Sequence, residues 1–525
     1  MKILTAEQMR RIDQRAEREH GIPSVTLMDN AGRAVAQTLL RLFPEAASRP
    51  AVIVCGKGNN GGDGIAAARH LQDANARAVV LLLAHGADLT GPSAHHLDLA
   101  RKAGIVVEET ATEAAWKKAL PRLAEASVVV DAILGTGLTG PSRGLAGTAI
   151  AGLNGAETPV ISVDLPSGLS ADTGDLIGPA VRASHTIALA CPKMCHTFGP
   201  AATLCGQLHV VDIGIPFEAV QAEQARLNLV SEEEVAGILA PREADSHKGD
   251  YGRLLVVGGS RGKSGAPALA CRAALRSGAG LVTAAAPASA QAILAGHVME
   301  MMTEPLPETD SGTLSAAAAG PLAALESACD VMAVGPGLTA LEETAALVRA
   351  LVTRANVPVV LDADGLNAFV GRAAELRGES RPLILTPHPG EMGRLMGRPG
   401  ETPITPAAVQ KDRVGAVRTF AMDHACYVVL KGHGTLVADP DGEIWMNPTG
   451  NPGMATGGTG DALTGIIAAL MAQGLSPLES CVLGVYVHGL AGDLAAADLG
   501  ETSMMAGDLI EYLPEAFLHL ERAAP

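Results

Sequence analysis

The sequence predicts two α/β domains, the first built on a doubly wound parallel sheet. Three observations lead to this prediction: the chain has 525 residues, short continuous apolar runs alternate with helical segments, and Gly-rich turns follow many of these runs. A length of this size fits two large domains or about three smaller ones. Because strands of a parallel sheet are buried on both faces, they read as continuous apolar runs rather than as alternating ones.

The first 215 residues or so begin with two helices and continue with apolar runs. Thr5, with Gln8 three residues later, predicts a capped helix that runs towards Glu19. A second helix is expected to follow the segment GIPSVTLMDNAGRAV and to end near Phe43. The predicted strands are AVIVC (51–55), AVVLLL (78–83), SVVVDAIL (127–134), PVISVDL (159–165) and HTIALA (185–190).

The alternation of apolar runs with helical segments is interrupted at residues 217–234, which are polar and have a helical pattern. The sequence therefore predicts a domain boundary near residues 218–230, with one domain over 1–220 and another over 228–525. The second domain is expected to contain the strands RLLVVGG, GLVTAAA, VMAVGPG, PVVLDADG, PLILTPHPG, YVVLKG and TLVAD. No repeat relates the two halves, so two different α/β domains are expected.

The composition excludes several functional classes. Lys and Arg number 39 against 56 Asp and Glu, a net charge of −17, and aromatic residues make up only 2%. Such a chain lacks both the basic surface and the stacking platforms that nucleic acids require. The eight cysteines include no CxxC pair, which favours reduced core thiols. The charged N-terminus and the absence of long unbroken apolar runs predict a cytoplasmic protein without membrane contact.

Three loops that follow predicted strands of the first half contain residues suited to a ligand site. The loop CGKGNNGGDG brings two asparagines and an aspartate to the start of a helix, where free N–H groups favour an anion. A second loop follows Asp131 and contains the flexible stretch 135–141, and a third contains Asp164 and Ser167. Ligands of open α/β sheets bind at the carboxyl ends of strands, so these loops are expected to meet.

Five motifs of the first half occur together: GIPSVTLMDNAG, GKGNNGGDG, DAILGTGLTGP, VDLPSGLSADTG and VVDIGIP. This set resembles the NAD(P)H-hydrate epimerase domain over essentially residues 1–215, although Asp29 stands where that family usually has Glu. The resemblance implies a Rossmann-like fold, Asp164 as the acid/base, and a potassium ion held by Asn60, Asp131 and Ser167, whose oxygens suit a hard cation. The substrate-binding residues it implies are Asn59, Asn60, Gly61, Gly62, Asp63, Gly135, Thr136, Gly137, Leu138, Thr139, Gly140, Pro141 and Asp164.

The strongest local signal of the second half is GNPGMATGGTGDALTGIIAAL. Its Gly-rich loop, 453–460, leads into a helix whose first turn holds Asp461. Free N–H groups at that helix terminus can stabilise a transferring phosphoryl group, and Asp461 is placed to take a proton from a substrate hydroxyl. No Lys follows the loop, so it is not a P-loop.

Upstream of this loop lie HKGDYGRLLVVGGS, SGAPALACRAALRSGAGLVT, AVGPGL, LDADGLNAF, TPHPGEMGRL and VLKGHGT. The whole set resembles the ribokinase-like ADP-dependent NAD(P)H-hydrate dehydratase domain over roughly residues 230–520. The resemblance implies that ADP, accompanied by magnesium, is bound by Lys431, Gly432, His433, Gly434, Thr435, Asn451, Pro452, Gly453, Met454, Ala455, Thr456, Gly457, Gly458, Thr459 and Gly460. The substrate contacts it implies are Ala266, Gly337, His388, Pro389, Gly390, Glu391, Met392, Gly393, Arg394 and Asp461.

Together the two resemblances imply a bifunctional metabolite-repair enzyme, an isomerase joined to a carbon–oxygen lyase. The substrates would be NADHX and NADPHX, whose nicotinamide ring is hydrated at carbon 6 and exists as R and S epimers. The epimerase would convert R into S. The dehydratase would phosphorylate the hydroxyl of the S form with ADP, with Asp461 as general base, and elimination would restore NAD(P)H and release AMP and phosphate.

Two alternatives stay open: the second half could be a vitamin or sugar kinase, and the first half a nucleotide-sensing Rossmann-like module. Lys193 is expected to be solvated rather than a phosphate contact, and Lys248 is as easily solvated as a substrate contact. Asp362 and Asp364 either form a turn or engage magnesium. A homo-oligomer is expected. The residues do not decide between ADP and ATP or between NADHX and NADPHX.

Overall fold

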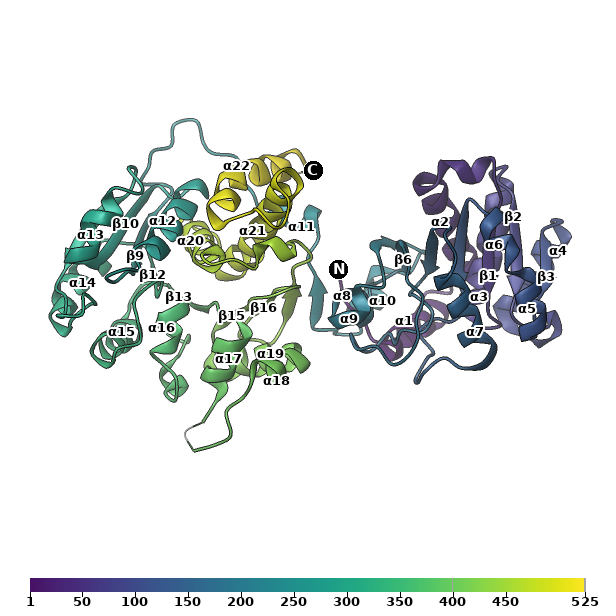
Figure 1. The fold of residues 1–525 in the computed structure, drawn as a ribbon, viewed down its shortest axis with the longest axis horizontal. Helices are drawn as coiled ribbons and strands as arrows, with labels where there is room; N and C mark the ends of the chain where they lie inside the picture. Colours follow the sequence, from purple (N-terminus) through teal and green to yellow (C-terminus); the bar gives the residue numbers. More distant parts are fainter. Residues whose placement is uncertain (399, 524–525) are drawn as a thin grey trace. The chain divides into compact units, whose positions relative to one another are not determined.

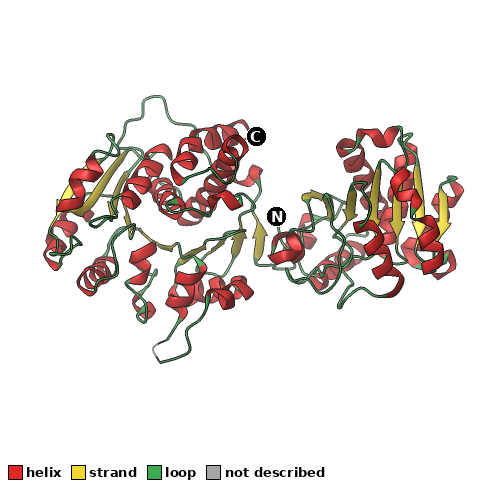
Figure 2. Cartoon of the chain, viewed as in Figure 1, coloured by secondary structure: helices red, strands yellow, loops and turns green. Residues whose placement is uncertain are grey.

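The protein is described here by a computed structural model that covers residues 1–398 and 400–523 (Figures 1 and 2). The chain divides into two compact units, Met1–Ala225 (unit 1) and Arg226–Pro525 (unit 2). Each unit has its own sheet, covered by helices, and its own apolar core. The predicted α/β fold class is therefore confirmed for both halves.

Unit 1 contains a seven-stranded sheet in the order β3-β2-β1-β4-β5-β6-β7, and all neighbouring strands are parallel. The strands are β1 (Ala51–Cys55), β2 (Ala78–Leu82), β3 (Val106–Glu109), β4 (Val128–Ala132), β5 (Val160–Val163), β6 (His185–Leu189) and β7 (Gln207–Val211). The predicted apolar runs match five of these strands. They do not include β3 and β7, because these edge strands are only partly buried and carry polar residues.

Helices cover both faces of this sheet. They are α1 (Ala6–Arg18), α2 (Ser24–Leu42), α3 (Asn59–Asp73), α4 (Gly91–Lys102), α5 (Glu113–Ala119), α6 (Pro121–Glu125), α7 (Gly144–Asn154), α8 (Met194–Thr197), α9 (Gly199–Ala202) and α10 (Phe217–Gln221). α2, α3 and α4 pack on one face, and α5, α6 and α7 on the other. Thr5 and Gln8 form the predicted capping box. α2 starts earlier than expected, directly after Pro23, so the expected preceding segment forms its first turns.

The connections on either side of β1 and β4 create the place where a ligand can enter. From β1 the chain builds outwards to β2 and β3, and it then returns to β4 on the other side of β1 and builds the rest of the sheet. The loops after β1 and β4 therefore diverge, which leaves a crevice between the carboxyl ends of the two strands. The Gly/Asn-rich loop and the loop after Asp131 both lie at this crevice.

Unit 2 contains a ten-stranded sheet in the order β11-β10-β9-β12-β13-β14-β15-β16-β17-β8. Its strands are β8 (Leu227–Leu229), β9 (Arg253–Val257), β10 (Leu281–Pro287), β11 (Met302–Leu306), β12 (Val331–Val334), β13 (Val359–Leu361), β14 (Leu383–Leu385), β15 (Tyr427–Leu430), β16 (Leu436–Ala438) and β17 (Ile444–Met446). Strand pairs are parallel from β11 to β15, and the pairs of β16 with β15 and β17 are antiparallel. The three-residue strands β8 and β17 and the exposed β11 were not anticipated.

The helices of unit 2 are α11 (Glu232–Ala236), α12 (Gly265–Arg276), α13 (Ala288–Ala295), α14 (Ala319–Glu326), α15 (Glu342–Arg354), α16 (Ala363–Asn367), α17 (Pro389–Met396), α18 (Pro406–Lys411), α19 (Arg413–His424), α20 (Thr459–Ala472), α21 (Pro477–Leu499) and α22 (Ala506–Ala523). Figure 1 shows α12, α20, α21 and α22 on one side of the sheet, with α15, α16 and α17 on the other. Within the described residues, only α21 is long and apolar enough to cross a membrane. Of its most apolar stretch 67% is buried against the rest of unit 2, as in a core helix.

The cysteines behave as the sequence predicts. All eight are free thiols, and seven of them are buried. Cys55 on β1 is an example: burial raises the pKa of its thiol far above the ordinary value, so the thiol stays protonated and acts as a small apolar core group.

Candidate active sites

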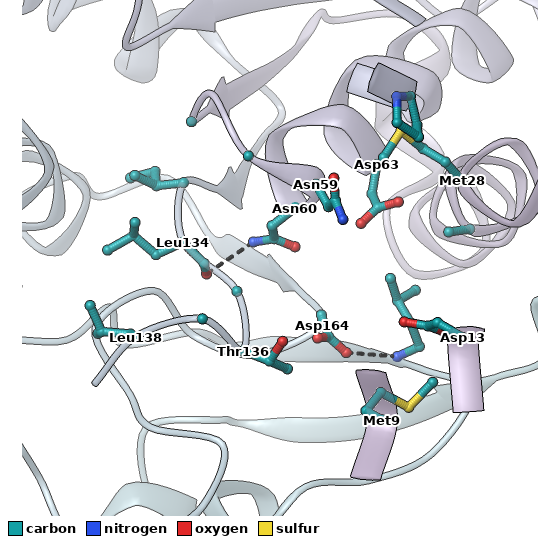
Figure 3. A pocket seen from close by; sticks show the side chains of 18 of the residues that line it. Met9, Asp13, Met28, Asn59, Asn60, Asp63, Leu134, Thr136, Leu138 and Asp164 are labelled. Atoms are coloured by element: carbon teal, nitrogen blue, oxygen red, sulfur yellow. Dashed lines mark hydrogen bonds between the residues drawn. The ribbon is translucent and has the colours of Figure 1, made fainter. Parts of the chain in front are cut away.

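Unit 1 contains a cavity of about 710 Å³ at the carboxyl ends of β1 and β4 (Figure 3). The predicted substrate residues that line it are Asn59, Asn60, Asp63, Gly135, Thr136, Gly137, Leu138 and Asp164. The other predicted substrate residues, Gly61, Gly62, Thr139, Gly140 and Pro141, lie outside this lining. The topology therefore brings the three predicted loops to one place, as the strand-end argument requires.

The glycines at the start of α3 are needed for packing. A Cβ atom at Gly61 would lie 1.9 Å from the carbonyl oxygen of Gly56, and one at Gly62 would lie 2.6 Å from the sulfur of Met28. A Cβ atom at Gly58, in contrast, would have no heavy atom within 4 Å. Gly61 and Gly62 therefore let α3 pack closely against its own protein, and Gly58 is the open position. The roles of Gly61 and Gly62 in binding the substrate stay predictions.

Asp164 is held at the cavity by a buried lysine. It follows β5 in the left-handed backbone region (φ +64°), which is unusual for a residue other than glycine. Its carboxylate accepts a hydrogen bond from the backbone N–H of Leu189 at 3.2 Å and pairs with the ammonium of Lys193. The Lys193 side chain is only 1% exposed and also donates to the carbonyl oxygen of Leu189 at 3.0 Å.

The expectation that Lys193 is solvated is therefore wrong. The reason is tertiary: Leu4 pairs with Lys193 through an isolated β-bridge, and the N–H of Leu4 donates to the Pro192 carbonyl at 3.0 Å. The N-terminal segment thus covers the loop that carries the lysine. A lone lysine after a strand gives no sign of this cover in the sequence, because the covering residue is almost 190 positions away.

Two further carboxyl groups line the same cavity, Asp13 from α1 and Asp63 from α3 (Figure 3). Burial raises the pKa of Asp63 well above its ordinary value, and the charges of Asp164 and Asp13 raise it further. Asp13 is exposed by surface area, but partial enclosure of its carboxyl group raises its pKa to about 6, while Lys193 acts in the opposite direction. The cavity thus contains three acids and one buried ammonium group. Asp63 was predicted as a site residue and Asp13 was not.

The three predicted potassium ligands also come together. Asp131 is fully buried and accepts hydrogen bonds from the Ser162 hydroxyl at 2.8 Å and the Ser167 hydroxyl at 2.5 Å. The Ser167 hydroxyl lies 3.1 Å from the carbonyl oxygen of Leu134, to which the Asn60 amide donates at 3.0 Å. Within the described residues, the amide oxygen of Asn60 is buried and has no hydrogen-bond partner. Burial raises the pKa of Asp131, and the bonds from Ser167 oppose that rise.

In unit 2, a lysine and an acid from neighbouring loops form the centre of the second candidate site. Lys431, directly after β15, pairs with Asp362 at 2.6 Å, and Asp362 follows β13. The other oxygen of Asp362 accepts a hydrogen bond from the hydroxyl of Thr464 in α20 at 2.7 Å. Glu391 of α17 lies 4.0 Å from the same ammonium. Burial lowers the pKa of Lys431, but the two carboxylates outweigh it, so the net shift is upwards and the lysine is charged.

Asp461 lies in the first turn of α20, next to this pair. A Cβ atom at the preceding Gly460 would lie 3.3 Å from the nitrogen of Lys431, a close contact, so the ammonium lies directly beside the start of α20. Burial raises the pKa of Asp461 to about 7, the negative charge of Asp362 adds to the rise, and Lys431 counteracts it. A carboxyl group that titrates near neutrality is suited to accept and release a proton.

The other predicted substrate residues of unit 2 lie in α12, in and directly before α17, and in the loop after β12. His388 caps α17. Its imidazole Nδ1 accepts a hydrogen bond from the N–H of Gly390 at 3.0 Å, and its backbone N–H donates to the carboxylate of Glu391 at 2.8 Å. Burial lowers the pKa of His388. Arg394 donates to Asn367 at 3.1 Å. After β12, a Cβ atom at Gly337 (φ +71°) would lie 3.4 Å from the Cβ atom of Ala266, so these two predicted residues are neighbours.

The Gly-rich loop is held by groups that the sequence did not reveal. The Asn451 amide donates to Asp493 of α21 at 2.9 Å, and its oxygen accepts from the N–H of Gly453 at 3.0 Å. His488, also in α21, bonds through Nε2 to the carbonyl oxygen of Thr459 at 2.9 Å. Burial lowers the pKa of His488 to about 4, so the ring is neutral at pH 7 and donates this bond. Both partners lie downstream in α21, a mostly apolar helix whose few polar residues do not indicate a site.

Known protein families match each of the two units separately. The family model described as NAD(P)H-hydrate dehydratase matches residues 254–515, and the model described as YjeF-related protein N-terminus matches residues 24–195. The bifunctional NAD(P)H-hydrate repair enzyme of Moorella thermoacetica is 46% identical over 99% of this chain and 97% of its own length. This chain is a member of the bifunctional NAD(P)H-hydrate repair enzymes.

Similarity to this family extends across distant organisms. The Escherichia coli repair enzyme is 35% identical over 97% of this chain and 92% of its own length. A solved structure titled as the ADP/ATP-dependent NAD(P)H-hydrate dehydratase from Bacillus subtilis is 31% identical and covers 56% of this chain and 99% of that chain, with a TM-score of 0.47. The predicted family is confirmed, and the ribokinase-like expectation for unit 2 agrees with its family match. The repair enzyme is therefore an isomerase and lyase by family.

Proposed function

We propose that unit 1 of this repair enzyme interconverts R- and S-NAD(P)HX within residues 1–220, and that residues 228–525 dehydrate S-NAD(P)HX with ADP, giving NAD(P)H, AMP and phosphate. The observation that carries the proposal is the presence of two separate acid–lysine centres, Asp164 with Lys193 and Asp461 beside Lys431, each at strand ends of its own α/β unit.

In the dehydratase site, Asp461 is proposed to take the proton of the ring hydroxyl while ADP transfers its terminal phosphoryl group to that oxygen. Lys431 would place a positive charge next to the transferring group, and the N–H groups at the start of α20, which begins at Thr459, are proposed to stabilise the same group. Phosphate is a far better leaving group than hydroxide, so elimination can then restore the reduced ring. Asp362 would orient Lys431, since its two oxygens are already bonded to Lys431 and Thr464.

Magnesium is proposed to accompany the nucleotide rather than to bind a protein-only site. Asp362 is engaged as described, and Asp364 accepts bonds from the Thr339 N–H at 2.9 Å and the Asn367 amide at 3.2 Å. Within the described residues, no group of three or more His, Cys, Asp or Glu side chains is arranged to hold a metal ion. Mg²⁺ commonly binds through substrate phosphates and one or two carboxylates, which agrees with this arrangement.

Potassium is proposed for the buried set formed by Asn60, Asp131 and Ser167. These residues fit the ion: the amide oxygen of Asn60 is buried without a partner in the described structure, and the carboxylate and hydroxyl beside it are hard oxygen donors. A bound potassium ion would supply a fixed positive charge near the anionic parts of the substrate. Neutralising Asp131 would also lower the cost of burying its charge.

Potassium is therefore expected to raise the thermal unfolding midpoint of unit 1, because a ligand that binds only the folded state stabilises it. The repair enzyme would be unfolded in potassium chloride and in tetramethylammonium chloride of equal ionic strength. Asn60→Ala should abolish the difference between the two salts, and the neighbouring Asn59→Ala should retain it. Equal midpoints for the unchanged enzyme in both salts would refute the potassium site.

The two proposed activities are tested together by recovery of reduced-nicotinamide absorbance from mixed R- and S-NADPHX. With ADP, the enzyme should convert all of the substrate, whereas Asp164→Ala should stop at the S fraction and continue only at the uncatalysed rate of epimerisation. Parallel runs with ATP and with no nucleotide establish which nucleotide is used. The absence of recovery with any nucleotide would contradict the proposal and favour a small-molecule kinase, which would phosphorylate a stable alcohol with ATP.

The remaining predictions concern the surroundings of the enzyme. NADHX, NADPHX and ADP are the proposed partners, and neither nucleic acid nor a membrane is expected to bind to an acidic chain of this composition. A cytoplasmic location and a homo-oligomeric assembly stay predictions. Lys248 lies exposed in the loop before β9, and its role also stays a prediction.

A further inference from the structure

Asp13 is a carboxyl group in the epimerase cavity that the proposed reaction has not yet used. It projects from α1 into the cavity opposite Asp164 (Figure 3). Within the described residues, its side chain makes no hydrogen bond or ion pair with the protein, while Asp164 is engaged by Lys193 and by the Leu189 N–H. One cavity acid is therefore held in place by a lysine and a backbone N–H, and another is unattached and open to the cavity.

The position of α1 is fixed by contacts near both of its ends, and these contacts also fix the position of Asp13 at the cavity. At the start of α1, the N–H of Ala6 donates to Asp172 at 2.6 Å. Further along the helix, Arg11 and Arg15 both pair with Glu223, whose side chain is only 4% exposed. These contacts hold the helix over the segment that carries Lys193, and they direct the Asp13 side chain into the cavity.

We propose that Asp13 is the general acid of the epimerase reaction, working with Asp164 as the base. The inference rests on the proposed epimerase function of unit 1 and assigns a residue to it. The hydrated carbon 6 of the substrate is bonded to both a hydroxyl and the ring nitrogen, so it is a hemiaminal carbon. Such a centre can exchange its two faces when the bond from the carbon to the nitrogen opens and closes again.

In the proposed step, the Asp164 carboxylate takes the hydroxyl proton, and the oxygen electrons form a carbonyl at carbon 6. The bond from carbon 6 to the ring nitrogen breaks, its electron pair moves to the nitrogen, and Asp13 gives that nitrogen a proton. Rotation about the adjacent carbon–carbon bond presents the other face of the aldehyde. Ring closure then returns one proton to Asp13 and one to the oxygen from Asp164, so no oxidant, reductant or water is consumed.

The electrostatics of the cavity support this division of roles. Lys193 pairs directly with the Asp164 carboxylate and fixes its position at the cavity, as the placement of a base requires. The raised pKa of Asp13, about 6, favours its protonated form relative to an ordinary aspartate, as an acid requires. Asp63 is less suited to the role, since it lies deeper, at 9% exposure. The charged side chains that face this space are Arg10, Asp13, Lys57, Asp63, Asp164 and Lys193.

The test follows epimerisation directly. Pure S-NADPHX is incubated with the full chain without ADP, and the R form is separated and measured over time, so that dehydration does not contribute. Asp13→Asn is expected to slow the appearance of R by roughly 10²–10⁴-fold, the usual effect of losing a general acid. Glu17→Gln, at an exposed acid of the same helix, should leave the rate unchanged.

The pH profile separates a chemical role from a structural one. For the unchanged enzyme the rate should fall as the pH rises through about 6, because the acid loses its proton, and this fall should disappear in Asp13→Asn. Asp13→Glu should keep the fall and recover part of the rate, even if both variants have lower thermal midpoints. Equal rates for Asp13→Asn and Glu17→Gln, or an unchanged pH profile in Asp13→Asn, would overturn the inference while the epimerase function stands. A rate no faster than the uncatalysed one in the unchanged enzyme would instead refute the epimerase function.

Discussion

Asp461→Asn is expected to reduce ADP-dependent recovery of NADPH from S-NADPHX by at least about 100-fold. The amide keeps the size and the hydrogen-bonding shape of the side chain, but it cannot accept the hydroxyl proton. The fold should be retained, because the change removes one negative charge from a region that already contains Asp362, Asp364 and Glu391. Thermal unfolding should therefore show an unchanged or higher midpoint.

The pH dependence and a matched variant identify the role of Asp461. A base must be ionised, so the rate of the unchanged enzyme should rise with pH through the region near 7 where Asp461 titrates. Asp423→Asn, at an exposed position of α19, should leave dehydration unaffected. Epimerisation of S-NADPHX by Asp461→Asn, measured without ADP, should also be normal. Full dehydratase activity in Asp461→Asn would remove the residue from the mechanism.

Lys193→Met is expected to abolish measurable epimerisation and to destabilise unit 1 by about 3 kcal/mol, the lower end of the cost of removing one partner from a buried ion pair. The Lys193 side chain is 1% exposed, so the carboxylate of Asp164, itself 11% exposed, would lose the ammonium partner that it has in the described structure. The loss of stability is at the lower end of that range because Asp164 lines the cavity, where water can solvate its carboxylate. Epimerisation of S-NADPHX and the urea unfolding transition of unit 1 are the two measurements.

An exposed ion pair provides the matched control. Lys102 pairs with Asp98 at 2.6 Å, and their side chains are 70% and 59% exposed, so Lys102→Met should cost less than about 1 kcal/mol and leave epimerisation intact. The double variant Lys193→Met/Asp164→Asn should recover part of the lost stability, because no unpaired charge remains, and should stay inactive. If Lys193→Met unfolds no more easily than Lys102→Met and epimerises normally, Lys193 does not have the role assigned to it.

The elements that the sequence predicted best are the central strands. AVIVC at β1 is apolar throughout, and RLLVVGG at β9 is apolar after its exposed first residue, Arg253, because helices cover both faces of the sheet at those positions. The elements that it did not predict are the edges, such as β3 and β11, and the three-residue strands β8 and β17. An edge strand has one neighbour and a solvent-exposed side, so it can contain polar residues and shows no continuous apolar run.

Some residues of the candidate sites could also be predicted from the sequence, and others could not. Asp164 and Asp461 could be recognised because each stands in a strand-end loop or at a Gly-rich helix start, within a motif of family-specific order. Lys193 and Asp13 could not, because nothing near them in the chain indicates the cavity into which they project. His488 was missed for a similar reason, since it is one of a few polar residues in a mostly apolar helix and nothing beside it indicates the loop that it contacts.

The sequence by itself determined the two α/β domains, the strand ends at which ligands bind, and the family of repair enzymes, because these properties follow from local patterns of polarity, glycine and motif order. Only the tertiary structure decided which charged groups meet. The segment around Leu4 covers Lys193 and thereby pairs it with Asp164, and β13 and β15 bring Asp362 to Lys431 across 69 positions of chain. Charges interact through space and not along the chain, so their partners, their burial and their pKa values become defined only when the chain is folded.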